Sequence, residues 1–324
     1  MDIDRGNITR IRGILIMALT DKDVLSKLKV IALGNFDGLH IAHKEVIDSA
    51  VSMAAELNAD ACILLFAEHS QKLLYGKAPS EIMSGEVKKR LFEETGANII
   101  TIDFNEIKDM QAPDFFEKIL IDKFNVCGIC CGFNYHFGKK AIGDTKMLEQ
   151  LCARYGIKLK VAPPVKYKGE TISSTRIRKA LTSGQIEDAN NMLGRAFSYK
   201  ETVVGGDKRG RALGTPTINQ VINKNMTVPK LGVYVSTAII NGRQYGAVTN
   251  IGVRPTIGTD NLGSETYIMD FSGNLYGQSI EICLHRFLRG ELKFKDLDDL
   301  RTQINKDAKA AEDFFKSMLN HVLN

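Results

Sequence analysis

The first half of the chain alternates short apolar runs with stretches in which apolar residues recur every three or four positions. Residues 46–57 have this helical spacing, and their charged neighbours fall on other faces. Nearly continuous apolar strands separated by such helices are typical of a parallel sheet covered on both sides. The pattern therefore predicts an α/β domain with a Rossmann-like, doubly wound parallel sheet. Its predicted strands are 30–33, 61–66, 98–104, 126–132 and 157–162.

The pattern changes near residue 194. Two short helices, over 174–181 and 185–193, are predicted just before it, each closing near a glycine. Beyond it, alternating apolar and polar positions favour an antiparallel barrel or sandwich, with Asn241-Gly242 as a tight hairpin turn. Its predicted strands are 232–240, 244–251, 265–271 and 280–288.

A long amphipathic helix is predicted from about 296 to 323. It is expected to pack on the barrel. The sequence thus predicts two domains, an α/β domain over 1–194 and an antiparallel β domain over 195–324.

Composition agrees with two domains and limits the partners. A chain of 324 residues with 44% hydrophobic content is long enough for a substantial core, which excludes a disordered chain. A net charge of +5 gives little support to a nucleic acid partner. No apolar run reaches the length of a membrane span, and the N-terminus lacks the features of a secretory signal. A cytoplasmic protein is expected.

Three of the six cysteines lie close together, at 127, 130 and 131. Cys127 and Cys130 have the spacing of half a zinc site, but no second closely spaced Cys/His pair accompanies them. Because the run is apolar and strand-like, buried reduced thiols are the favoured interpretation.

The segment 31–43, IALGNFDGLHIAH, follows the first predicted strand. Gly34 and Gly38 allow a sharp turn and a close approach of the backbone to a ligand, and the next helix directs its free N–H groups at an anion. His40 and His43 are suited to donate hydrogen bonds to phosphate oxygens. A zinc pair on a helix usually has a spacing of four with a glutamate beside it, which is missing here. A buried structural pair of histidines stays open.

Residues 34–43, GNFDGLHIAH, resemble the signature of the nucleotidyltransferase superfamily, and GNFDG is similar to the bacterial riboflavin kinase/FAD synthetase family. That family usually has glycine where this chain has Ala42, and proline on either side of the histidine in the segment 66–70. The resemblance implies an ATP-binding loop. Its ATP-binding residues would be Gly34, Phe36, Asp37 and Gly38.

A second segment, 172–178 (ISSTRIR), resembles the second nucleotide motif of the same family. Its hydroxyl groups, helix N-terminus and two arginines suit a triphosphate, although an ordinary capped basic helix has the same composition. The resemblance implies a catalytic role for Arg176 beside His40 and His43. It also implies ATP binding by Ser173, Ser174, Thr175 and Arg178.

Between these motifs lies 132–139 (GFNYHFGK), followed by Gly143-Asp144. Its aromatic residues are suited to stack on an isoalloxazine ring or to fill a core. The segment resembles the part of the family that contacts flavin, which implies flavin binding by Asn134 and Asp144.

Residues 205–219 contain four glycines and three basic residues in fifteen positions. Such a loop can wrap phosphates, although it does not match a P-loop, and a surface hairpin is the alternative. Thr217 and Asn219 lie two residues apart in an extended segment, so their oxygens point to one side and suit Mg²⁺. The segment resembles the riboflavin kinase motif Gly-x-Pro-Thr-x-Asn. This implies that Thr217 and Asn219 serve ATP and magnesium and that Gly210 and Gly214 bind ATP.

Glu265 is predicted to head a strand on whose face Tyr267, Met269 and Phe271 also lie. A carboxylate on an apolar face tends to have a raised pKa, which suits a general base, whereas a strand-end glutamate facing water is the alternative. The family resemblance implies that Glu265 is the catalytic base and that Arg289 lies near the flavin.

The resemblance extends from about residue 28 to 318. It implies a bifunctional enzyme that phosphorylates riboflavin with ATP to FMN and then adenylylates FMN to FAD with release of pyrophosphate. Mg²⁺ would be the cofactor, riboflavin, FMN and ATP the ligands, and neither nucleic acid nor membrane a partner. The alternatives are a chain with one active module and a flavin-binding regulator without turnover. The sequence leaves the oligomeric state open.

Overall fold

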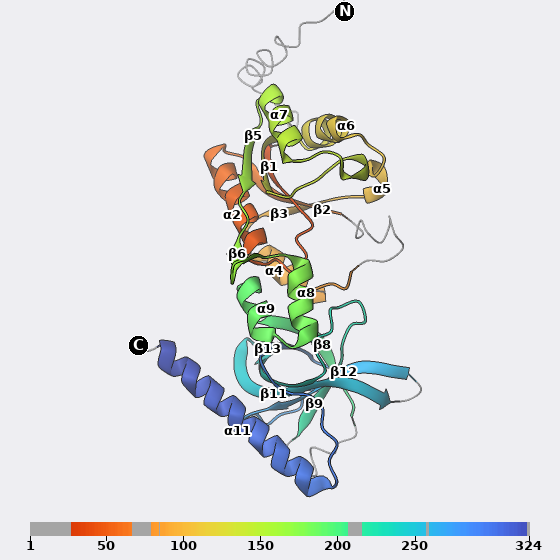
Figure 1. Ribbon diagram of the computed structural model, residues 1–324, viewed down its shortest axis with the longest axis vertical. Coiled ribbons are helices and arrows are strands. Elements are labelled where there is room, and N and C mark those ends of the chain that lie inside the picture. The colour runs from red at the N-terminus through yellow and green to blue at the C-terminus, as the bar shows by residue number, and fades with distance from the viewer. Residues whose placement is uncertain (1–26, 67–78, 84, 207–215, 257–258, 323–324) are drawn as a thin grey trace, which may run out of the picture. The chain divides into compact units, whose positions relative to one another are not determined.

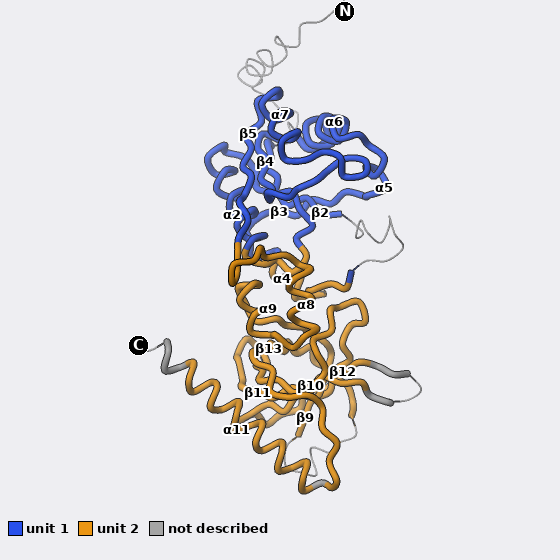
Figure 2. The backbone as a smooth tube through the Cα atoms, in the orientation of Figure 1, with its two compact units in different colours: residues 1–36, 42–79, 92–165 blue, residues 37–41, 80–91, 166–324 orange. Residues whose placement is uncertain are grey.

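The computed structural model describes residues 27–66, 79–83, 85–206, 216–256 and 259–322 (Figure 1). The chain divides into two compact units (Figure 2). The first comprises residues 1–36, 42–79 and 92–165, and the second residues 37–41, 80–91 and 166–324. Two short segments from the N-terminal half, 37–41 and 80–91, thus pack with the C-terminal half.

The first unit is built on a five-stranded sheet in the order β3-β2-β1-β4-β5, with every neighbouring pair parallel. This confirms the predicted parallel sheet. The third strand ends earlier than predicted, because Asp103 caps a following helix, α5 (Phe104–Ile107), and accepts a hydrogen bond from Asn105 N at 2.8 Å. The strands are β1 (Lys29–Leu33), β2 (Asp60–Phe66), β3 (Asn98–Ile102), β4 (Val126–Gly132) and β5 (Lys158–Ala162).

Helices cover both faces of this sheet. On one face, Met53 of α2 (Ile41–Glu56) packs on Gly128, where a Cβ would lie 2.6 Å from the Met53 sulfur. On the other face, η1 (Phe115–Lys123), a π-helix, and α7 (Thr145–Tyr155) share one apolar core with β1, β2 and β4. Two short helices, α6 (Ala112–Asp114) and η2 (Lys139–Ala141), also belong to this unit, whereas most of α4 (Gly85–Glu93) belongs to the second unit.

The cysteines of β4 are reduced, and Cys130 and Cys131 are buried in the sheet while Cys127 is half-buried. Burial raises the pKa of the Cys130 thiol to about 11 and that of Cys131 to about 12. Thiols that stay protonated at neutral pH are poor nucleophiles and poor metal ligands.

The second unit begins with a small hairpin, β6 (Lys166–Tyr167) and β7 (Glu170–Thr171), which the sequence did not predict. The two predicted helices follow as α8 (Ser174–Ser183) and α9 (Ile186–Leu193). They end at Gly184 and Gly194, whose φ angles of 81° and 71° are in the left-handed region that favours glycine.

A closed barrel completes the second unit, with the strand order β10-β11-β12-β9-β8-β13. It settles the choice between barrel and sandwich. The prediction that Glu265 heads its strand is wrong: it lies inside β12, and Phe271 lies beyond the end of that strand. The strands are β8 (Phe197–Val204), β9 (Thr217–Val221), β10 (Gly232–Ile240), β11 (Arg243–Thr256), β12 (Thr259–Ile268) and β13 (Ser279–Arg289).

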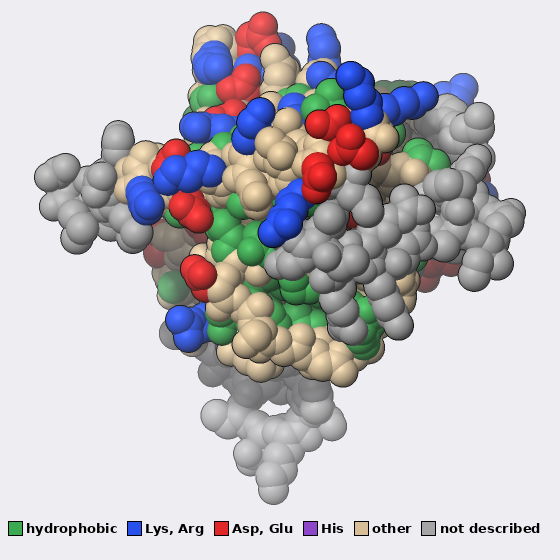
Figure 3. Space-filling model, turned by 90° about the horizontal axis from the view of Figure 1, so that it is seen from below, with side chains coloured by type: hydrophobic (Ala, Val, Ile, Leu, Met, Phe, Trp, Pro, Cys, Tyr) green, Lys and Arg blue, Asp and Glu red, His purple; other side chains and the backbone are tan. Residues whose placement is uncertain are grey.

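The long C-terminal helix is confirmed as α11 (Leu297–Val322). Ala311 is fully buried against Val233 and Val235 of the barrel, with Phe314 and Phe315 packed beside it. Figure 3 views the chain from below, where basic and acidic side chains are interspersed around apolar positions. No large area of one charge sign is visible among the described residues of that face.

Candidate active site

The predicted kinase residues lie side by side on the barrel. In the register of β12 and β9, Glu265 is directly opposite Asn219 and Tyr267 is opposite Thr217. Directly opposed side chains project to the same face of a sheet. Ser264 and Thr266 are buried in the barrel interior, so Glu265, Asn219 and Thr217 share the outer face of these strands. The structure therefore brings together a carboxylate, an amide and a hydroxyl that are far apart in the sequence.

Asn250 extends this row on the other side of Glu265, because it is directly opposite Glu265 in the pairing of β11 with β12. Its side-chain oxygen is buried and accepts no hydrogen bond from any described residue. Sequence reasoning missed Asn250, since only the register of two strands connects it with Glu265. A buried acceptor in this state needs an explanation, and its place beside Glu265 makes it a candidate site residue.

The glycine-rich loop begins against the same row. A Cβ at Gly206 would lie 2.3 Å from the side-chain nitrogen of Asn219, so this position has no room for a larger residue. The predicted ATP-binding residues Gly210 and Gly214 lie outside the described residues.

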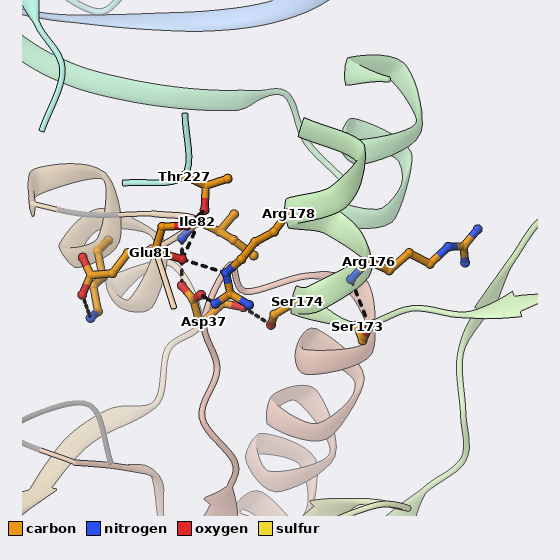
Figure 4. Close-up of polar contacts among 10 residues, drawn as sticks. Asp37, Glu81, Ile82, Ser173, Ser174, Arg176, Arg178 and Thr227 are labelled. Atoms are coloured by element: carbon orange, nitrogen blue, oxygen red, sulfur yellow. Dashed lines mark hydrogen bonds and ion pairs between the residues drawn. The ribbon is translucent and has the colours of Figure 1, made fainter. Parts of the chain in front are cut away.

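In the N-terminal motif, Asp37 and Arg178 bind one another (Figure 4). The Asp37 carboxylate forms an ion pair with the Arg178 guanidinium and accepts a hydrogen bond from Ile82 N at 3.1 Å. Ser174 Oγ donates to the Asp37 carbonyl at 2.8 Å. These contacts join the two predicted nucleotide motifs, and Asp37 and Ser174 lie 137 positions apart in the sequence. Asp37, Arg178 and Ser174 thus hold the motif in place, and direct ATP contacts by them stay a prediction.

The same cluster continues into the segment after β9. Arg178 Nε donates to the carbonyl of Ser80 at 2.7 Å, and Thr227 N donates to the carbonyl of Glu81 at 2.7 Å. The hydroxyls of Ser80 and Thr227 lie 2.9 Å apart. Residues 80–82 are therefore hydrogen-bonded on one side to the two nucleotide motifs and on the other to Thr227, in the segment that follows β9.

Helix α8 presents its N-terminus beside this cluster. Ser173 is the N-cap and accepts a hydrogen bond from Arg176 N at 3.3 Å, while Thr175 is exposed. The Arg176 guanidinium donates to the carbonyl of Glu170 at 2.8 Å and lies over the ring of Tyr167. The β6–β7 hairpin thus holds this predicted catalytic arginine.

His40 is 4% exposed. Burial lowers its pKa from 6.5 to about 4; a backbone hydrogen bond opposes this change and the charge of Arg195 adds to it. The imidazole is therefore neutral at physiological pH and donates a single N–H.

We expect the His40 ring to remain neutral between pH 8 and 5.5. In the unfolded chain it would protonate near 6.5, so its contribution to folding, about 3 kcal/mol, is present above that pH and is lost as the pH falls towards 4. Histidine ring resonances, with that of His40 assigned from its loss in His40→Gln, check this by NMR titration. A midpoint near 6.5 would contradict it.

The first unit holds the other motif residues. The rings of Phe36 and His43 meet edge to face at 5.3 Å, and Phe36 is buried. A Cβ at Gly34 would lie 3.2 Å from the Phe36 ring. Asp144 caps α7 by accepting a hydrogen bond from Met147 N at 2.9 Å, while Asn134 is exposed. The ATP-binding and flavin-binding roles of these residues stay predictions.

Arg289, predicted to lie near the flavin, anchors the C-terminal helix. Its guanidinium binds the buried carboxylate of Asp307, with the shortest contact at 2.6 Å, and Gln303 donates to the same carboxylate at 2.9 Å. The bidentate geometry fixes α11 against the end of β13.

Replacement of Arg289 by alanine is expected to lower the free energy of unfolding by about 3 kcal/mol, because it leaves the Asp307 charge buried without its counterion. Removing Asp307 as well should restore part of the loss. Urea unfolding of the single and double variants measures both, and Arg301→Ala, at an exposed position of the same helix, is the control. Equal loss in Arg289→Ala and Arg301→Ala would contradict the anchoring role.

The chain combines a parallel α/β sheet and the loop that carries His40 with a closed barrel that carries Glu265 beside Asn219. These features define a two-module, ATP-dependent transferase. The family model described as FAD synthetase matches residues 23–176, and that described as riboflavin kinase matches residues 193–315. The chain belongs to the bifunctional riboflavin kinase/FMN adenylyltransferase family. It phosphorylates riboflavin to FMN with ATP and adenylylates FMN to FAD.

Several relatives carry that description over almost their whole length. The protein of Listeria monocytogenes is 34% identical over 90% of this chain and 93% of its own. That of Pseudomonas fluorescens is 32% identical over 87% and 91%. A solved structure described as a macrolide-efflux protein from Streptococcus pneumoniae superposes with a TM-score of 0.81 at 28% identity, over 89% of this chain and 94% of that one.

The solved structure is thus described by another activity than the two bifunctional relatives. In the part of the chain that the structure describes, no helix is both long enough and apolar enough to cross a membrane. The two family matches and the bifunctional relatives favour flavin phosphorylation and adenylylation by both modules over the alternatives of one active module or a regulator.

Proposed function

We propose that the row formed by Thr217, Asn219 and Glu265 carries the phosphorylation of riboflavin. The Glu265 carboxylate takes the proton of the ribityl 5′-hydroxyl as that oxygen attacks the γ-phosphorus of ATP. The new O–P bond replaces the bond to the β-phosphate, and ADP leaves. The single observation that supports this is the register that sets Glu265 directly opposite Asn219.

The donor set of this row fits Mg²⁺, which prefers hard oxygen ligands and keeps several waters. Thr217 and Asn219 would hold it, and the buried oxygen of Asn250, which accepts no hydrogen bond from the described residues, lies in the same row. When bound, the ion would neutralise charge on the phosphates of ATP. Because β9 is bonded to β12 along the row, the side chains of Thr217 and Asn219 keep their places beside Glu265 and would hold the ion near the base.

The N-terminal motifs are proposed to carry adenylylation of FMN. The phosphate of FMN attacks the α-phosphorus of a second ATP, and pyrophosphate leaves. His40, as a neutral imidazole, donates to the developing charge, and the hydroxyl and N–H groups at the start of α8 bind phosphate oxygens. His43 and Arg176 act as further donors, and Asp37 and Arg178 keep the loop in place. Positioning and charge stabilisation carry this step, since no protein nucleophile is needed.

Cytoplasmic action is part of the proposal, because both steps consume ATP and the buried cysteines are reduced.

Chromatography of flavins tests the assignment. The purified full chain, with ATP and Mg²⁺, should convert riboflavin to FMN and FAD, and should convert added FMN to FAD with pyrophosphate. Chelation of the magnesium should stop riboflavin phosphorylation. Phosphorylation that continues undiminished in excess chelator would reject the metal role of Thr217 and Asn219.

A further inference from the structure

The loop that carries His40 is bent in a way that its own sequence does not favour. Phe36, Gly38 and Leu39 have φ angles of 50°, 85° and 43°. Glycine adopts this left-handed region freely, but for Phe36 and Leu39 it costs roughly 1 kcal/mol each. Bonds from outside residues 36–39 offset the cost of this conformation.

Arg195 supplies two of these bonds. Its guanidinium donates to the carbonyl of Gly38 at 2.7 Å and to that of Leu39 at 3.1 Å. The planar fork of arginine suits two neighbouring acceptors, and a lysine ammonium has no such fixed pair of donors. These carbonyls belong to the two residues before His40, so the guanidinium holds the two peptide groups that lead into His40.

Arg195 comes from a different part of the sequence than the other residues that bind this loop. Asp37 is held by Ser174 and Arg178, which belong to the second nucleotide motif, within or next to the segment that matches FAD synthetase. Arg195 lies in the segment that matches riboflavin kinase, one residue after the glycine that ends α9. The kinase segment therefore contributes a side chain to the loop of the other reaction.

We propose that Arg195 is a positioning residue for the adenylylation of FMN, which acts by holding the backbone of Gly38 and Leu39 and thereby the direction of the His40 ring. The inference rests on the proposed role of His40. Its consequence is that the adenylylating module does not end at residue 194: an arginine at the start of the kinase segment is part of its machinery. The positive charge beside the buried imidazole also favours the neutral form of His40.

The experiment compares Arg195→Ala, Arg195→Lys and Arg286→Ala in the full chain. Arg286 is an exposed arginine of β13 that pairs with Glu187 at 2.9 Å, and it serves as the control. Riboflavin phosphorylation and FMN adenylylation are measured on the same preparations. Arg195→Ala is expected to lower the kcat of adenylylation about 100-fold, with the KM for ATP changed less than about threefold, because a displaced catalytic group affects the transition state more than ATP binding.

Three further results distinguish positioning from a general loss of structure. Riboflavin phosphorylation by Arg195→Ala should stay within about twofold of the unaltered chain, since the carbonyls that Arg195 binds, those of Gly38 and Leu39, lie outside the Glu265 row. Arg195→Lys should recover part of the adenylylation, and millimolar guanidinium ion should recover part of it in Arg195→Ala. Arg286→Ala should leave both activities unchanged.

Each remaining outcome counts against the inference. Equal loss of both activities in Arg195→Ala, without rescue by guanidinium, would assign Arg195 to folding alone. If Arg195→Ala does not fold, Arg195→Lys becomes the test. Full adenylylation by Arg195→Lys, which lacks the planar pair of guanidinium donors, would overturn the inference. His40→Gln separates the two proposals. If it is inactive in adenylylation while Arg195→Ala is normal, only the positioning role fails; if it is fully active, the role of His40 fails and the inference fails with it.

Discussion

Replacement of Glu265 by glutamine is expected to lower riboflavin phosphorylation by about 10³-fold and to leave FMN adenylylation within about twofold. Glutamine has the size of glutamate and keeps its place opposite Asn219, but it has no carboxylate to take the proton of the attacking hydroxyl. Initial rates of FMN formation from riboflavin, and of FAD formation from FMN, measure the two effects on one preparation.

The control for Glu265→Gln is Glu312→Gln, which neutralises an exposed carboxylate of α11 that pairs with Lys309. It should not change either rate. Loss of both activities in Glu265→Gln, with an intact fold by circular dichroism, would contradict a base that serves one reaction only. Retained phosphorylation would remove Glu265 from the mechanism.

Replacement of His40 by glutamine should have the converse result, a loss of about 10²- to 10³-fold in adenylylation with phosphorylation retained. The buried imidazole has one N–H to donate, and a glutamine amide does not reproduce both its direction and its flat packing surface. Rates of FAD and pyrophosphate formation from FMN measure the loss.

His40→Gln and Glu265→Gln are also controls for one another. Two separate sites require that each variant keeps the activity that the other loses. Mixing the two purified variants should then restore FAD formation from riboflavin, because FMN released by one chain is a substrate for the other. Failure of the mixture, with each single activity retained, would indicate that FMN does not pass between chains.

The order and type of most elements were predictable because they follow from local periodicity. The apolar runs of the first unit gave its five parallel strands, and Asn241 and Gly242 occupy their hairpin turn with φ angles of 51° and 78°. The strands β8 and β9 were not predicted. In β8 the buried residues Phe197, Ser198 and Tyr199 are consecutive, so the alternation that identifies a half-buried strand is missing there.

In the candidate site, too, the residue types were predictable from the sequence and the contacts between them were not. The residue types of Thr217, Asn219 and Glu265 identified oxygen chemistry, but their adjacency depends on the register of β9 with β12, which hydrogen bonds between distant segments decide. Asp37, Arg178 and Arg289 were named from the family resemblance as ATP-binding and flavin-binding residues, and these roles stay predictions. Only the tertiary structure gave them partners, since an ion pair depends on which chains approach one another.

The sequence by itself determined the two classes of fold and the chemical groups available to ATP and flavin, because periodicity and residue type are local properties. The tertiary structure decided which groups meet: Glu265 with Asn219 and Asn250, Asp37 with Arg178, and Arg195 with the backbone before His40. These contacts join segments up to 157 residues apart. Closure of the barrel and folding of the His40 loop bring these residues into contact. A local pattern of residues does not predict such contacts, because they depend on which distant segments meet.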